Sequence, residues 1–345
     1  MYFFCPKICS KLCPNCLVAK VLIVIFRYKT LIMNLIDFNS RFTDEQTCRD
    51  YLKEKREEEG VVCTCGSTSH YWIRTRELWK CKACGTCLNL RSGTIMEKSH
   101  IPVRFWFMAL HLMTSTKKSF SALEMQRQLG LTNYESTWYM MQKIRKTMGK
   151  RDSKYQLQGE IEVDEGFYEV VTIPERDELG NLVKEPSSQK RGRGSEKQKK
   201  VLVMVESFPN PQQTDKHKKK RVMGFVKMVT IDDLSSTGIN YELKKSLDPN
   251  STIVTDGWRG YSRSTEVIRK HISNVVPSKE AHKTLPWVHT VIANSKRLFL
   301  GTHHSIGHDY LQNYLDEFCY KLNRRNFKSD LFDRMITAGV NDTWY

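Results

Sequence analysis

The sequence lacks a long uninterrupted apolar run. Its most hydrophobic stretch, residues 17–33, is broken by Lys20, Arg27 and Lys29, so it contains no run of the ~18 apolar residues typical of a membrane-spanning helix. It also lacks the small-residue cleavage site of a secretory signal. We therefore expect no membrane partner. We interpret the N-terminus up to Met33, the expected true start, as an extension outside the fold. A short amphipathic anchor or a signal-like segment is the alternative.

Negative charge is scarce: 38 Asp and Glu stand against 55 Lys and Arg, which gives a net charge of +17 and a sequence pI near 9.3. Such an excess indicates an acidic partner, most commonly nucleic acid. A ribosomal or merely solubilising basic surface is the alternative. The 345 residues are enough for two or three domains with at least one substantial core.

The eleven cysteines are not placed as a disulfide framework. Five lie between Cys63 and Cys87, in VCTCG and CKACGTC, which predicts a zinc ribbon held by the thiolates of Cys63, Cys65, Cys81 and Cys84. The first pair is C-x-C rather than C-x-x-C, which leaves Cys87 or His70 as stand-ins. We expect a structural and not a catalytic zinc, because no open site with a general base is nearby. Free buried cysteines are the alternative.

Residues 119–148 have two apolar helical stripes separated by Gly130, which predicts a helix-turn-helix. Its second helix would direct Lys143, Arg145 and Lys146 toward DNA phosphates. Any helical hairpin shows the same pattern, so the spacing alone does not distinguish the two.

Two further basic segments predict DNA contact and strongly salt-dependent binding. One is a Gly- and Lys-rich loop near residues 185–200, and the other is a lysine cluster at residues 216–221. Their candidate DNA-binding residues are Lys190, Arg191, Arg193, Lys197, Lys199, Lys200, Lys218, Lys219 and Lys220.

Acidic residues concentrate at one place, GEIEVDEGFYEV at residues 159–170, which reads as a strand with Glu160, Glu162 and Asp164 on one face. A second strand, STIVTDG, ends at Asp256. Two carboxylates at neighbouring strand ends suit Mg²⁺ or Mn²⁺, and two such ions activate an attacking hydroxyl on a phosphodiester. Two unrelated aspartates are the alternative. We expect Glu160 and Glu162 to be supporting or solvated charges.

The order of these motifs, followed by WVHTVIANSKRLFLGTHH and YLQNYLDEFCYKLNRR, resembles the DDE transposases of the Merlin type and their bacterial insertion-sequence relatives. The resemblance spans residues 34–326. It implies an RNase H-like catalytic core, DNA cleavage and strand transfer at terminal inverted repeats, and a dimer or larger complex on DNA. It also implies that Asp164 and Asp256 are the first two catalytic acids. A transposase acts in the nucleus of a eukaryote or in the cytoplasm or nucleoid of a bacterium.

The third catalytic residue departs from the Asp-Asp-Glu pattern, because no glutamate lies between Trp287 and Gly301. Some relatives use asparagine with a nearby lysine, which favours Asn294 with Lys296. His289, seven residues before Lys296, is the rival. Asn294 and His289 are roughly 140° apart around a regular helix, so both cannot point at one metal. Glu317 belongs to an amphipathic helix, and we expect it to pair with Arg324 or Lys321 rather than with a metal.

We therefore predict an α/β multidomain protein: a zinc ribbon and a helix-turn-helix, then an RNase H-like mixed β-sheet flanked by helices. The expected boundaries are 1–33 for the extension, 34–100 for a helix plus the zinc ribbon, 101–150 for the helix-turn-helix, 151–330 for the catalytic domain and 331–345 for a C-terminal tail. The alternatives to an active transposase are an inactive or domesticated DNA-binding derivative and a zinc-ribbon nuclease.

Overall fold

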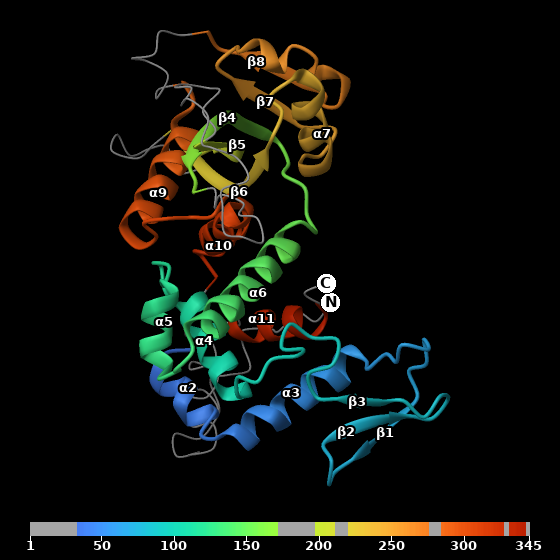
Figure 1. Ribbon diagram of the computed structural model, residues 1–345. Helices are drawn as coiled ribbons and strands as arrows, with labels where there is room; N and C mark the ends of the chain where they lie inside the picture. Colours follow the sequence, from blue (N-terminus) through green and yellow to red (C-terminus); the bar gives the residue numbers. More distant parts are fainter. Residues whose placement is uncertain (1–32, 172–196, 211–219, 276–283, 328–330, 343–345) are drawn as a thin grey trace, which may run out of the picture.

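The computed structural model describes residues 33–171, 197–210, 220–275, 284–327 and 331–342. Figure 1 shows a lower part of helices with a small sheet, and an upper part built on a larger sheet. The lower part contains α2 (Leu35–Arg41), α3 (Glu45–Glu59), β1 (His70–Ile73), β2 (Leu78–Cys81), β3 (Cys87–Asn89), α4 (Val103–Ser115), α5 (Ala122–Leu129), α6 (Tyr134–Asp152) and α11 (Leu331–Val340).

The small sheet is antiparallel, in the order β1-β2-β3. One of its faces packs against α3: the Trp79 indole Nε1 donates to Glu57 at 3.1 Å, and the Lys53 ammonium lies 5.2 Å from the Trp72 ring centroid. The sheet is therefore anchored to the helical part rather than standing alone.

Helices α5 and α6 match the pair expected around Gly130. Gly130 ends α5 with φ 66°, in the left-handed region that favours glycine. Asn133 then caps α6, because its side-chain oxygen accepts from the Ser136 amide at 2.8 Å. The turn between the two helices is thus set by local sequence.

The upper part is a five-stranded mixed sheet in the order β6-β5-β4-β7-β8. Strands β4, β5 and β6 are antiparallel neighbours, whereas β7 and β8 run parallel to β4. Its elements are β4 (Glu160–Glu169), β5 (Gln198–Pro209), β6 (Arg221–Ile231), α7 (Ser236–Ser246), β7 (Thr252–Thr255), η2 (Arg259–Tyr261), η3 (Ser264–Glu266), β8 (Lys270–Ser273), α9 (Pro286–Thr302), η4 (His308–Tyr310) and α10 (Leu311–Asn323).

Alternation along β4 separates the two faces of this sheet. Ile161 and Val163 belong to a hydrophobic core shared with α7, whereas Tyr168 belongs to a second core shared with α9 and α10. The even-numbered residues of β4, Asp164 among them, therefore face α9.

The C-terminal residues, expected to be a tail, contain a packed helix. Four side chains of α11 are buried in the core of the lower part, together with residues of α2, α3, α4 and α6: Phe332, Met335, Ile336 and Val340. The Tyr51 hydroxyl of α3 donates to Asp333 at 2.6 Å. The chain thus returns from the upper sheet to complete the N-terminal core, because α11 presents an apolar stripe that needs burial.

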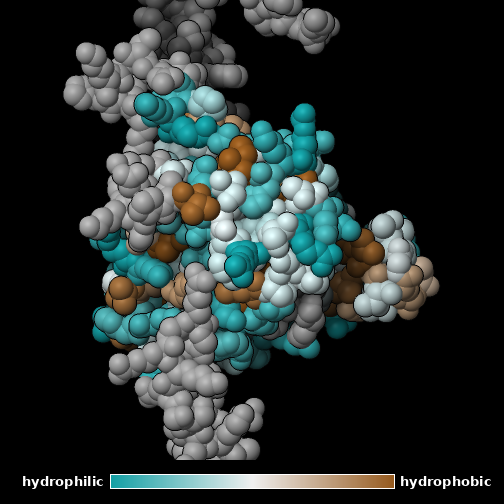
Figure 2. Space-filling model, turned by 90° about the horizontal axis from the view of Figure 1, so that it is seen from above, coloured by the Kyte–Doolittle hydropathy of each residue, from teal (hydrophilic) through white to brown (hydrophobic). Residues whose placement is uncertain are grey.

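The surface at the end of the molecule that carries β7, β8 and α7 is mainly hydrophilic, with hydrophobic side chains singly or in small groups (Figure 2). Within the described ranges, none of the helices combines the length and apolarity needed to cross a membrane.

Candidate active site and zinc centre

The first predicted acid, Asp164, lies in the middle of β4 on the α9 side of the sheet. Its Oδ1 accepts from the Glu165 amide at 2.8 Å, and its Oδ2 is 3.4 Å from Nδ1 of His289. The Asp164 side chain is 18% exposed. It is therefore held in a defined orientation and remains accessible to a bound ion.

The second predicted acid, Asp256, directly follows β7. The parallel register pairs Ile161 with Ile253 and Glu162 with Val254, where the pairing ends, so Asp164 and Asp256 each lie two residues beyond the last pair on their own chain segments. Asp256 is exposed, and its Oδ1 accepts from the Trp258 amide at 3.0 Å. Asp256 thus follows β7, the strand next to β4, which carries Asp164.

Glu162 has a role that the sequence pattern did not reveal. It is 2% exposed, and its Oε2 accepts from the amides of Trp287 and Val288, at 2.8 and 3.0 Å, at the start of α9. Burial raises the pKa of Glu162, while these hydrogen bonds oppose the rise. Rather than a solvated charge, Glu162 is an N-terminal anchor that fixes α9 over β4. Glu160, by contrast, pairs with Arg221 at 2.7 Å on the partly exposed edge.

Helix α9 directs His289 and not Asn294 toward Asp164. Asn294 is exposed, and it lies roughly 140° around the helix from His289. His289, the rival of Asn294, thus lies near Asp164, and the identity of the third ligand stays a prediction. Lys296 lies seven residues after His289 and therefore on the same face of α9. Its Nζ is 5.5 Å from the centroid of the Tyr168 ring.

A buried tyrosine lies behind the acids, on the other face of the sheet. The Tyr261 side chain is 0% exposed, and its hydroxyl donates to Oε1 of Glu165. Burial raises the pKa of Tyr261 well above its usual value, and the charges of Glu165, Asp164 and Asp256 add to this effect. The motif TDGWRGY contains this residue, but its spacing alone did not indicate the partner.

The four predicted cysteines form one cluster in the zinc ribbon, with all Sγ atoms of Cys63, Cys65, Cys81 and Cys84 within 4.8 Å of one another. Cys63 and Cys84 are 3.5 Å apart, and Cys65 and Cys81 are 3.7 Å apart. Tetrahedral zinc with Zn–S bonds of about 2.3 Å requires sulfur atoms about 3.8 Å apart, so the cluster fits this ion. Neither Cys87 nor His70 belongs to the cluster. The short C-x-C pair is therefore sufficient without a stand-in.

The cations of α6 that were predicted to contact DNA all have partners within the protein. Arg145 is 1% exposed and pairs with Glu317 at 2.8 Å, because it lies at the buried junction of α6 and α10. This placement contradicts its predicted phosphate contact. Lys143 is partly buried and donates to the Glu97 carbonyl at 3.1 Å, and Lys146 has an interaction partner too.

The other predicted cations divide between described and undescribed parts. Lys197, Lys199 and Lys200 lie at or just before the start of β5, and Lys220 is exposed just before β6. The Lys200 ammonium donates to the Asp232 carbonyl at 3.1 Å. The remainder lie outside the described residues: Lys190, Arg191, Arg193, Lys218 and Lys219.

Solved structures similar to this chain include two complexes of the Mos1 transposase. The Mos1 mariner paired-end complex with Mn is 12% identical, with a TM-score of 0.28 over 69% of this chain and 80% of that one. The Mos1 strand transfer complex is 10% identical, with a TM-score of 0.26 over 69% and 79% of the two chains. TM-scores this low mean that the chains do not superpose as wholes.

Sequence comparisons are more specific. An uncharacterized protein in transposable element ISH50 of Halobacterium salinarum is 23% identical over 297 residues, which cover 83% of this chain and 93% of that protein. The model of the transposase zinc-ribbon domain matches residues 43–87, and the model of the ISXO2-like transposase domain matches residues 156–323. The first range holds the cysteine cluster and the second holds Asp164, Asp256 and His289. Residues 43–87 of this chain therefore match a transposase zinc-ribbon domain, and residues 156–323 match an ISXO2-like transposase domain.

Proposed function

We propose that this chain is a DNA transposase that binds the terminal inverted repeats of its element and performs metal-dependent DNA cleavage and strand transfer. The proposal is supported by the position of Asp164 and Asp256 two residues beyond the last β4–β7 pair, with His289 3.4 Å from Asp164. The order β6-β5-β4-β7-β8, with β4, β5 and β6 antiparallel and β7 parallel to β4, supports an RNase H-like core.

Asp164, Asp256 and His289 would hold Mg²⁺ or Mn²⁺, which activates the attacking oxygen and stabilises the leaving oxygen of a phosphodiester when bound. The 3.4 Å between Asp164 Oδ2 and His289 Nδ1 is close to the ~3 Å that separates neighbouring ligands of an octahedral ion with bonds of about 2.1 Å. Among the described residues, only the four cysteines bring three or more ligand atoms within 4.8 Å of one another. Asp164, Asp256 and His289 are therefore not all within this distance of one another.

The remaining residues of the site orient these groups and bind DNA. Glu162 binds the first turn of α9 and thereby fixes the position of His289 relative to β4. Lys296, on the same face of α9, would contact a phosphate as a point charge beside the acids. Lys197 and Lys199, at or just before the start of β5, would add contacts to the DNA backbone, which predicts steep salt dependence.

The zinc ribbon and the α5–α6 pair would bind the element ends, and two ends held together would require a dimer or larger complex on DNA. The buried position of Arg145 excludes it from this surface. Contacts to DNA would therefore come from other exposed groups of the lower part.

Cleavage of DNA that carries the element's flanking ends tests the proposal. Wild type with Mg²⁺ should nick and join this DNA, whereas Asp164→Ala and Asp256→Ala should bind it equally well and leave it uncut. Binding without metal-dependent nicking by wild type would indicate an inactive DNA-binding derivative. Cleavage without strand transfer would indicate a nuclease instead.

A further inference from the structure

Hydrogen bonds connect the two proposed metal-binding acids through the far side of the sheet. The Glu165 amide donates to Asp164, and the Glu165 carboxylate accepts from the Tyr261 hydroxyl. The Tyr261 amide donates to the Trp258 carbonyl at 3.1 Å, and the Trp258 amide donates to Asp256 at 3.0 Å. The path therefore begins at one carboxylate and ends at the other.

This connection is rigid on the Asp256 side. Tyr261 is fully buried in the core that Ile161, Val163 and α7 share. Gly260 lies so close to the Trp258 ring that an added Cβ would be 2.0 Å from it. The turn after Asp256 is thus closely packed at Gly260, and Tyr261 at its end is buried in the core.

The site requires such a connection because backbone pairing does not extend to Asp256. Strand β7 ends at Thr255, and its paired register with β4 ends at Glu162 and Val254. Asp164 and Asp256 are like charges that each follow the last β4–β7 pair by two residues, so they repel each other before a cation binds. A group outside the strand ladder must therefore keep them in place.

We propose that Tyr261 is a positioning residue for the metal site, which sets the spacing of Asp164 and Asp256 through its hydrogen bond to Glu165. This inference rests on the proposed function, because it assumes that the two acids hold a divalent cation. Tyr261 itself does not touch the cation or the DNA. By this hydrogen bond Tyr261 would hold Asp164 and Asp256 in place before the cation binds, so that less of the free energy of cation binding is spent on ordering the two carboxylates.

Mn²⁺ binding to the zinc-loaded full-length chain, measured without DNA by the electron paramagnetic resonance of free Mn²⁺, tests this role. Tyr261→Phe should raise the Mn²⁺ dissociation constant about tenfold. Tyr51→Phe is the matched control, because it also removes a hydroxyl that donates to a carboxylate. That carboxylate is Asp333 of α11, outside the five-stranded sheet. Tyr51→Phe should leave Mn²⁺ affinity unchanged. Equal Mn²⁺ affinity for Tyr261→Phe and wild type would overturn the inference.

A second pair of variants covers the case in which Tyr261→Phe does not fold. Glu165→Ala should weaken Mn²⁺ binding about tenfold, whereas Glu165→Gln, which keeps a carbonyl acceptor for the tyrosine, should stay within about threefold of wild type. Tyr261→Phe combined with Glu165→Ala should be no worse than either single variant, because both break the same connection. Additive losses would contradict it.

Asp164→Ala separates failure of this inference from failure of the proposed function. If wild type binds Mn²⁺ no more tightly than Asp164→Ala, the metal site itself is absent and the proposed function fails. If wild type binds more tightly than Asp164→Ala but equals Tyr261→Phe, only the positioning role fails.

Discussion

His289 and Asn294 occupy the same helix, but only His289 approaches Asp164. We expect His289→Ala to lower Mg²⁺-dependent cleavage about 100-fold, because it would remove the proposed third metal ligand, whereas Asn294→Ala should remain within about threefold of wild type. Single-turnover cleavage of end-bearing DNA, at equal DNA occupancy, measures the difference. The reverse order of effects would restore Asn294 as the third ligand.

A second residue-scale prediction concerns Asp316 of α10, which lies against α6 where a Cβ on Gly149 would be 2.0 Å from its Oδ2. Burial raises the pKa of Asp316 to about 7, and nearby Asp152 adds to the rise. In the unfolded chain this carboxyl ionises near pH 4, whereas in the folded protein it ionises near pH 7. The free energy of unfolding therefore falls as the pH rises from about 4 through about 7.

Wild type should therefore lose on the order of 1–2 kcal/mol of unfolding free energy between pH 5.5 and pH 8 through this group. Asp316→Asn should remove that part of the loss. Urea unfolding of both proteins at the two pH values measures it. An unchanged pH dependence in the variant would show that Asp316 is not its source.

At the scale of elements, the β1–β3 sheet is short and depends on the cysteine cluster. Cys65→Ser should lose zinc and disorder the sheet, because structural zinc supplies the folding energy of such small domains. Cys87→Ser is the matched control, since Cys87 lies outside the cluster, and it should keep one zinc per chain. Metal content and the fluorescence of the Trp72–Trp79 pair report the outcome; equal zinc loss in both variants would contradict the assignment.

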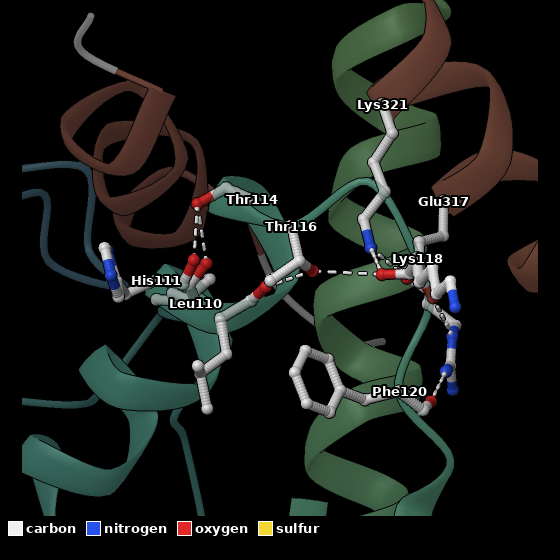
Figure 3. Close-up of polar contacts among 10 residues, drawn as sticks. Leu110, His111, Thr114, Thr116, Lys118, Phe120, Glu317 and Lys321 are labelled. Atoms are coloured by element: carbon white, nitrogen blue, oxygen red, sulfur yellow. Dashed lines mark hydrogen bonds and ion pairs between the residues drawn. The ribbon is translucent and has the colours of Figure 1, made fainter. Parts of the chain in front are cut away.

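The α6–α10 junction is held by a buried charge cluster. Glu317 pairs with Arg145 and with Lys321, both at 2.8 Å, and Figure 3 shows Lys321 directed at the Lys118 carbonyl of the α4–α5 connection. Burial alone would raise the pKa of Glu317, but Lys321 and Arg145 lower it to about 2. The expected partner Lys321 is thus confirmed, whereas Arg324 pairs with Asp152 instead.

Glu317→Gln should destabilise the protein by about 3–5 kcal/mol, because it leaves Arg145 buried without its counter-charge. Glu266→Gln, which breaks an exposed pair with Arg263, should cost less than about 1 kcal/mol. Urea unfolding at pH 7 compares the two variants. A small effect for Glu317→Gln would mean that water or another group compensates the buried arginine.

At the scale of the whole molecule, the last described helix closes the first core. A chain that ends at residue 327 would lack α11 and would expose the apolar side chains of α3, α4 and α6 that α11 covers. We expect this truncation to aggregate or to lose most of its stability. A chain that ends at Asp342 keeps α11 and should match wild type. Solubility and thermal unfolding of the two truncated chains decide the point.

The candidate residues of both sites were recognisable in the local sequence. Asp164 and Asp256 each lie at a recognisable place in a strand pattern, and the cysteine pairs have spacing that a metal requires. The roles of Glu162 and Tyr261 were not predictable, because their partners, the start of α9 and Glu165, are distant in the sequence. Arg145 was misassigned for the same reason: its partner Glu317 lies 172 residues away.

The sequence by itself thus determined which residues are candidate metal ligands, since strand alternation and cysteine spacing are short-range properties. Only the tertiary structure decided which face each side chain occupies and which partner it meets. The choice between His289 and Asn294 depends on how α9 is rotated about its axis. Glu162 of β4 holds the start of α9 by accepting from the Trp287 and Val288 amides. The return of α11 to the N-terminal core likewise depends on long-range burial of apolar surface, which no local pattern encodes.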